Sequence, residues 1–195
     1  MPLEHPLCIV RHGETDWNVE GRLQGQQDVP LNGRGRDQAE AVGRVLKRDY
    51  PQVLGYAFVA SPLLRARETM ELMRGAMQVD PASYRIDARL KELTFGAWEG
   101  FTWDEMKQRE PEACAARTAD KWGYCPPGGE SYAMLSDRIA GWLAEVKEPT
   151  VAVTHGGVAR VLLGLLAGMS HTELPMKNIV QGRALMFEGG KARWV

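Results

Sequence analysis

Residues 7–15 read Leu-Cys-Ile-Val-Arg-His-Gly-Glu-Thr, an apolar run that changes abruptly into polar and charged side chains. Four consecutive apolar residues are typical of a buried strand, and Arg11 ends the run. Two later segments, residues 56–61 and 151–155, have the same form. The sequence therefore predicts three buried strands, each followed at once by polar residues.

Helical patterns separate these strands. Residues 32–47 begin with a good N-cap asparagine and carry apolar residues at three-and-four spacing. Ser61-Pro62 is predicted to begin a second helix, because proline is tolerated in a first turn, and Ser131 is predicted to cap a third. Residues 91–127, rich in Trp, Gly and Pro, are predicted to form loops and one or two short helices. Alternating strands and helices favour an α/β fold with a mainly parallel sheet covered on both faces.

Composition limits the class of protein. The 195 residues contain 24 Lys and Arg against 25 Asp and Glu, so no overall field attracts nucleic acid or an acidic membrane, and we expect neither partner. Three cysteines without a CxxC pair argue against a disulfide framework and a structural zinc site. The first residues lack a signal-peptide pattern, so we expect a cytoplasmic protein. No repeat or linker interrupts the chain, which predicts one domain over residues 1–195, and no motif decides whether it forms a homodimer.

The polar residues after the three strands are predicted to meet. Carboxyl ends of parallel strands face a common crevice, and helix N-termini beyond them present N–H groups to anions. Arg11 and Arg65 can bind phosphate oxygens through paired, charge-assisted hydrogen bonds. Nearby positive charge lowers the pKa of a histidine, so His12 would stay neutral and keep the lone pair that a nucleophile needs. With His155, these residues predict a compact oxyanion site.

Glu92 is the carboxyl group best placed in the sequence to protonate a leaving oxygen. Each residue alone has a plainer explanation, since His12 could be a hydrogen-bonded buried histidine, Arg65 a surface residue and Glu92 a solvated charge. Two histidines and a glutamate could also bind zinc. Arginines beside the nucleophile would repel that cation, however, and no HExxH motif is present. We therefore expect no metal and no other cofactor.

Six segments, in order, resemble the histidine phosphatase superfamily, the phosphoglycerate mutase-like proteins. They are residues 11–18, 21–39, 61–69, 90–100, 127–131 and 153–157. The resemblance runs from about residue 7 to residue 160, and the ordered blocks make it specific. It implies a three-layer α/β/α sandwich with a mixed, mainly parallel six-stranded sheet.

The resemblance also implies a role for each matching position. His12 would become phosphohistidine, and Glu92 would act as the acid for the leaving group and then as the base for water. His155 would bind the phosphoryl oxygens beside His12. The implied phosphate-binding and substrate-binding positions are Arg11, Asn18, Gln24, Gly25, Arg65 and, through its backbone N–H, Gly156.

The two main branches of this family differ in what accepts the phosphoryl group. Mutases return it to a phosphoglycerate, need a bisphosphoglycerate primer and usually carry a longer insertion before the second histidine. Here residues 100–127 are short for that insertion, and Gly157 stands where mutases tend to have Asn. We favour a metal-independent phosphatase that hydrolyses a small phosphomonoester through phosphohistidine, with a cofactor-dependent phosphoglycerate mutase as the alternative. A non-catalytic phosphate-binding module fits least well, because every expected catalytic residue is present.

Overall fold

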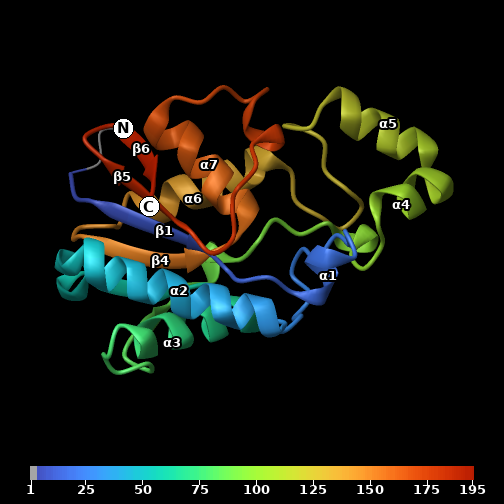
Figure 1. Ribbon diagram of the computed structural model, residues 1–195. Helices are drawn as coiled ribbons and strands as arrows, with labels where there is room; N and C mark the ends of the chain where they lie inside the picture. Colours follow the sequence, from blue (N-terminus) through green and yellow to red (C-terminus); the bar gives the residue numbers. More distant parts are fainter. Residues whose placement is uncertain (1–3) are drawn as a thin grey trace.

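Six strands form one sheet in the computed structural model, which describes residues 4–195 (Figure 1). The strands are β1 (Leu7–Arg11), β2 (Ala57–Ala60), β3 (Arg85–Ile86), β4 (Thr150–Thr154), β5 (Ala184–Glu188) and β6 (Lys191–Trp194). Their order is β3-β2-β4-β1-β5-β6; strands β3, β2, β4 and β1 run parallel to one another, and β5 runs antiparallel to both of its neighbours, β1 and β6. The expected mixed, mainly parallel sheet is confirmed.

Helices cover both faces of this sheet. In chain order, the helices of the described residues are α1 (Asp16–Val19), α2 (Gly33–Asp49), α3 (Leu64–Ala76), α4 (Trp103–Arg109), α5 (Pro111–Ala119), α6 (Tyr132–Leu143) and α7 (Gly156–Ala167). Short 3-10 turns lie at Pro51–Gly55, Ala88–Leu90, Gly96–Trp98 and Leu174–Met176. Helices α2 and α3 pack on one face, and α6 and α7 on the other (Figure 1). The three-layer α/β/α fold class is therefore confirmed, and within the described residues no helix is long and apolar enough to cross a membrane.

Strand β1 carries apolar side chains on both faces of the sheet, so helices must pack on each face. Its side chains alternate between the two sides of the sheet. Leu7 and Ile9 join the core under α6 and α7, while Cys8 and Val10 join the core against α2 and α3. All four are at most 1% exposed, which fits a continuous apolar run in a strand buried on both faces.

Strand register brings the polar residues together at the carboxyl ends. Arg11 of β1 pairs with Thr154 of β4, so the next residues, His12 and His155, leave the sheet side by side. The backbone N–H of His12 still donates to the carbonyl of Thr154 at 2.9 Å, and that of Ser61 donates to Val153 at 3.0 Å. Three strands therefore deliver their polar ends to one point, as the sequence predicts.

Helix α3 begins later than its sequence suggested. The prediction that Ser61-Pro62 starts this helix is wrong, because the first helical residue is Leu64. Ser61 remains extended while its backbone N–H bonds the sheet, and the carboxylate of Asp28 accepts from Leu64 N at 2.6 Å. A residue from another segment thus satisfies a free N–H group at the start of the helix. Arg65 still lies in the first turn.

Helices α4 and α5 form an arm beyond the end of the sheet toward which β4 points (Figure 1). They confirm the short helices expected between residues 91 and 127. Trp98 anchors the arm, since its ring is fully buried and its indole Nε1 donates to Glu110 at 3.0 Å. A small separate core of Leu23, Trp98, Met106 and Cys114 joins the arm to the start of the chain.

Candidate active site

His12 is held as a neutral ring with one nitrogen free to react. Its Nδ1 lies 2.7 Å from the carbonyl oxygen of Gly13, which can only accept, so Nδ1 carries the ring hydrogen. Arg65 Nε donates to Nε2 at 3.2 Å, which places the lone pair on Nε2. Burial, then the charges of Arg65 and Arg11, keep the pKa of His12 well below its usual value. The expectation of a neutral histidine beside two arginines agrees with this geometry.

The turn after His12 tolerates no side chain. A Cβ on Gly13 would lie 2.2 Å from the carbonyl oxygen of Gly35 in the first turn of α2. The Gly13 N–H donates to the hydroxyl of Thr69 in α3 at 3.0 Å. Glycine therefore allows the backbone of this loop to lie against two helices, which fixes the direction of the His12 ring.

Both arginines expected at the site lie beside His12 in the wall of one cavity. Arg65 is fully buried, and the carbonyls of Gln27 and Gly25 accept from its two Nη atoms at 2.7 and 2.8 Å. Arg11 Nη1 donates to Ile179 at 2.7 Å. Burial lowers the pKa of Arg11 to about 10, so it stays charged at neutral pH. Backbone carbonyls hold both side chains in place without neutralising their charge.

His155 lies directly behind His12. The two ring centroids are 5.2 Å apart, and His155 Nε2 lies 2.7 Å from the hydroxyl of Ser61. Burial, followed by the charges of Arg65 and its other neighbours, lowers the pKa of His155 well below its usual value. Ser61, the residue after β2, thus orients the ring of the residue after β4.

Two buried nitrogens beside His12, Arg11 Nε and His155 Nδ1, have no hydrogen-bond partner within residues 4–195. Buried polar groups are normally paired, and leaving one unpaired costs about 1–3 kcal/mol. Arg11 Nε is always a donor. His155 Nδ1 is a donor when Ser61 donates to the other ring nitrogen. Both atoms fit an oxyanion ligand that would accept from them.

The side-chain carboxylate of Glu92 lies against the N-terminus of α7. Both of its carboxylate oxygens lie 3.1 Å from the backbone nitrogen of Gly157, and its own neighbour Leu93 donates to Oε1 at 2.9 Å. A Cβ on Gly157 would lie 2.4 Å from Glu92 Oε1. The absence of a side chain at residue 157 therefore allows the carboxylate to reach the helix end, where free N–H groups favour negative charge.

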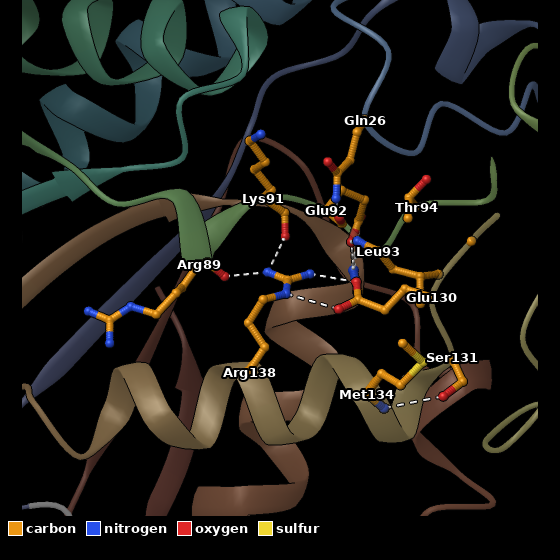
Figure 2. A network of polar contacts seen from close by, with 12 residues as sticks. Gln26, Arg89, Lys91, Glu92, Leu93, Thr94, Glu130, Ser131, Met134 and Arg138 are labelled. Carbon is orange, nitrogen blue, oxygen red and sulfur yellow. Dashed lines mark hydrogen bonds and ion pairs between the residues drawn. The ribbon is translucent and has the colours of Figure 1, made fainter.

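The backbone around Glu92 is fixed from two sides, as Figure 2 shows. Gln26 Nε2 donates to the carbonyl of Glu92 at 3.0 Å. From α6, Arg138 donates to the carbonyls of Arg89 and Lys91 and forms a two-pronged ion pair with Glu130 (Figure 2). Such paired bonds fix direction as well as distance. Arg138 thereby connects the segment before Glu92 to the segment that leads into α6.

A cavity of about 140 Å³ opens over His12. Seven of the nine expected site residues line it: Arg11, His12, Asn18, Gln24, Gly25, Arg65 and Glu92. The other two do not, since His155 is completely buried behind His12, and Gly157 takes the place in the wall that we expected for Gly156. Helix α7 begins at Gly156, so its second residue is the one that faces the cavity.

Asn18 presents one polar group to this cavity. Its Oδ1 accepts from Thr15 N at 3.1 Å and from Gln181 Nε2 at 2.9 Å, which leaves the amide Nδ2 available. Gln181 also donates to the carbonyl of His12 at 3.2 Å. It comes from the loop before β5, and no sequence signal indicated that it reaches the site.

Sequence reasoning missed several residues of the cavity wall. They are Arg22, Leu23, Leu93, Phe95, Tyr132 and Arg160. One signal could have identified Arg160, which lies four residues after Gly156 and hence on the same face of α7. In the part of the chain that the structure describes, no group of three or more His, Cys, Asp or Glu side chains is placed to hold a metal ion.

Comparisons with known proteins agree with this arrangement. A metal-independent phosphoserine phosphatase of Arabidopsis thaliana is 36% identical over 162 residues, which cover 80% of this chain and 66% of that protein. A 2,3-bisphosphoglycerate-dependent phosphoglycerate mutase of Methylobacterium radiotolerans is 30% identical over 195 residues, covering 95% of this chain and 90% of the relative. The solved structure of the α-ribazole phosphatase of Shigella flexneri superposes with a TM-score of 0.81 at 26% identity, over 96% of this chain and 93% of that one.

The match to a family model is wider still than the blocks that the sequence first indicated. The model of the histidine phosphatase superfamily, branch 1, covers residues 7–194. It therefore includes β5, β6 and the loop that carries Gln181. With the two histidines and two arginines assembled at the carboxyl ends of β1, β2 and β4, the chain belongs to the histidine phosphatase superfamily.

Proposed function

We propose that this chain is a metal-independent phosphomonoester hydrolase that acts through phosphohistidine on a small phosphorylated metabolite. One observation carries the proposal: His12 is neutral, and its Nε2, which carries the lone pair, lies 3.2 Å from Arg65 Nε in the wall of a cavity that Arg11 also lines. A nucleophile and the charges that stabilise a phosphoryl group in transfer are thus in one place. A relative named as a phosphatase agrees with this activity.

In the first step His12 Nε2 attacks the phosphorus atom of the ester. The N–P bond forms, the ester P–O bond breaks, and Glu92 delivers a proton to the departing oxygen. Arg11 and Arg65 bind the equatorial oxygens, where negative charge is spread during transfer. In the structure Arg65 Nε donates to His12 Nε2. When the Nε2 lone pair forms the bond to phosphorus, Arg65 Nε donates to a phosphoryl oxygen instead.

In the second step the Glu92 carboxylate takes a proton from water, whose oxygen attacks phosphorus while the N–P bond breaks. Inorganic phosphate leaves, and His12 returns to its neutral form. The carbonyl of Gly13 holds the ring in one tautomer throughout. Burial favours that neutral form at both ends of the cycle, because it penalises the imidazolium.

Catalysis without a metal is part of the proposal. The guanidinium groups of Arg11 and Arg65 occupy the positions from which a divalent cation would otherwise stabilise phosphoryl oxygens. We also propose that the protein works in the cytoplasm. All three cysteines are free, and Cys125 is exposed, which suits a reducing compartment.

Phosphoryl transfer between phosphoglycerates is the alternative function, and one relative is named as such a mutase. Two features favour water as the acceptor. The segment that would carry a mutase insertion holds only the short helices α4 and α5. Gly157 also lets Glu92 approach the helix end, where an asparagine would displace it. Isomerisation of 3-phosphoglycerate with a bisphosphoglycerate primer measures this alternative, and its absence with ample enzyme would exclude it.

The proposal is tested by phosphate release from p-nitrophenyl phosphate and a set of cellular phosphomonoesters, with a chelator present. We expect the wild type to release phosphate and His12→Ala to release none. Circular dichroism shows whether the variant is folded. Activity that survives in folded His12→Ala, or that is lost on chelation in the wild type, would disprove the mechanism.

A further inference from the structure

The side-chain carboxylate of Glu99 accepts hydrogen bonds from two separate segments of the chain. From a nearby segment, Thr94 Oγ1 donates to Oε1 at 2.7 Å and Phe95 N donates to the same oxygen at 3.1 Å. From a segment far earlier in the chain, Gln26 N donates to Oε1 at 3.0 Å and Gln27 Nε2 donates to Oε2 at 3.0 Å. Hydrogen bonds to an ionised acceptor are stronger than those between neutral groups. Glu99 therefore ties the two segments together.

The earlier segment, the loop of residues 25–27, also holds one of the two arginines of the site. The carbonyls of Gly25 and Gln27 accept from the two Nη atoms of Arg65 at 2.8 and 2.7 Å. Arg65 Nε donates to His12 Nε2 at 3.2 Å, so the guanidinium lies between this loop and the nucleophile. Because the carboxylate binds the loop and the loop binds the guanidinium, the position of the guanidinium depends on the carboxylate.

Gly25 shows how closely the carboxylate fits against the loop. Its φ is +50°, a left-handed conformation that glycine adopts without strain. A Cβ on this residue would lie 1.9 Å from Glu99 Oε1 and 2.5 Å from its carboxylate carbon. The same residue gives its carbonyl oxygen to Arg65. The backbone of one glycine therefore connects the carboxylate to the guanidinium.

Glu99 acts on the site only through other residues. Gly25 and Arg65 line the cavity over the nucleophile, whereas the half-buried Glu99 does not. Burial lowers the pKa of Arg65, and the charges of Glu92, Asp28 and Glu99 oppose that effect. The carboxylate behind the loop thus favours the charged form of a guanidinium whose own acceptors in the loop are uncharged carbonyls.

We propose that Glu99 is a positioning residue for Arg65, which it holds through the loop of residues 25–27 in the place that phosphoryl transfer requires. This role deepens the proposed hydrolysis and rests on it, because Arg65 has this task only if a phosphoryl group is transferred to His12. Groups that stabilise a transition state must be fixed beforehand, and a displacement of about 1 Å costs about 100-fold in rate. A carboxylate that only stabilised the fold would leave turnover by a folded variant unchanged.

The test is a double-mutant cycle on the hydrolysis of p-nitrophenyl phosphate, with circular dichroism to show that each variant is folded. We expect Glu99→Ala to lower kcat/KM by about 100-fold, even though p-nitrophenolate needs no proton from Glu92. Arg65→Ala should lower kcat/KM by at least as much. The double variant should then be slower than Arg65→Ala by no more than about twofold, because two residues that act through one contact are not additive.

Conservative variants separate positioning from a general loss of packing. Glu99→Gln keeps an acceptor for the three donors on Oε1, so its kcat/KM should stay within about tenfold of the wild type. Glu99→Asp keeps the charge but draws the oxygens back by one methylene, so its kcat/KM should lie below that of Glu99→Gln. It replaces Glu99→Ala in the cycle if that variant does not fold.

Glu173→Ala is the matched control. The Glu173 carboxylate also accepts from a backbone N–H and from a hydroxyl, both of Ser170, at 3.2 and 2.6 Å. It is exposed and lies outside the cavity wall. We expect Glu173→Ala to keep the wild-type kcat/KM.

The outcomes separate the role of Glu99 from the function on which it rests. Wild-type kcat/KM in folded Glu99→Ala would show that Arg65 needs no such support and would refute the role. An equally large loss in the Arg65→Ala background would refute it too, because Glu99 would then act independently of Arg65. If the wild type releases no phosphate from p-nitrophenyl phosphate or any other ester, the proposed hydrolysis itself fails.

Discussion

Replacing Gly157 with alanine would displace the Glu92 carboxylate while changing the stability of the fold little. The new Cβ would lie 2.4 Å from Glu92 Oε1, closer than carbon and oxygen can approach, and 3.3 Å from Leu135. The carboxylate is the movable partner of this contact, so it must leave the Gly157 N–H. That movement breaks the two contacts of 3.1 Å that hold both oxygens at the end of α7.

The size of the effect follows from these contacts. A hydrogen bond to a charged group contributes about 1.5–3 kcal/mol, and a well-placed general acid contributes about 10²–10⁴ in rate. We predict that Gly157→Ala lowers kcat/KM, which reports the first step, by about 100-fold for alkyl phosphates and by much less for p-nitrophenyl phosphate, because p-nitrophenolate leaves without a proton. Stability should change little, since alanine favours a helix over glycine by about 1 kcal/mol and offsets part of the lost contact.

The assay is steady-state hydrolysis of an alkyl and a p-nitrophenyl ester, together with thermal unfolding. Gly141→Ala in α6 is the matched control, because no atom lies within 4 Å of the position of its Cβ. That variant should gain stability and keep its activity. An equal loss of kcat/KM on both esters, or wild-type kcat/KM for alkyl esters in folded Gly157→Ala, would refute the assignment of Glu92 as the proton donor.

Three further predictions concern the groups around this centre. Glu92→Gln should lower kcat for alkyl phosphates at least about 100-fold and Glu14→Gln less than about tenfold, since the Glu14 carboxylate binds the N-cap of α2; the reverse order would overturn their roles. Arg138→Met should lower kcat and leave KM little changed in a protein that remains folded. Full activity in Arg138→Lys would show that the paired hydrogen bonds of Arg138 to Glu130 are not required to position Glu92. Because burial lowers the pKa of His12 and His155, the unfolded state binds more protons below about pH 6.5. Urea unfolding should then show that the free energy of unfolding decreases as the pH falls below about 6.5, by up to about 1.4 kcal/mol per pH unit for each histidine. His12→Ala should remove the contribution of one histidine to this slope.

Local chemistry made much of the fold predictable from the sequence. The run at Leu7–Arg11 is buried on both faces because it is apolar throughout, and Asn32 caps α2 through its side chain, which accepts from Gly35 at 2.9 Å. Strand ends predicted the meeting of His12 and His155, because parallel strands in register bring their carboxyl ends together.

The features that escaped prediction depend on distant segments. The start of α3 is set by Asp28, which lies far earlier in the chain. Gln181, in the loop before β5, reaches the site and donates to Asn18 Oδ1 at 2.9 Å. No local pattern specifies such contacts, so they become visible only in three dimensions.

Capture of the phosphorylated enzyme tests the proposed phosphohistidine mechanism most directly. Protein mixed briefly with substrate is denatured at alkaline pH, which preserves an N–P bond, and digested for mass spectrometry. We predict one added phosphoryl group on the peptide that carries His12, absent from His12→Ala and accumulating in Glu92→Gln during turnover of p-nitrophenyl phosphate. Hydrolysis by wild type with no phosphoryl group on His12, or with the group on another residue, would contradict the central claim.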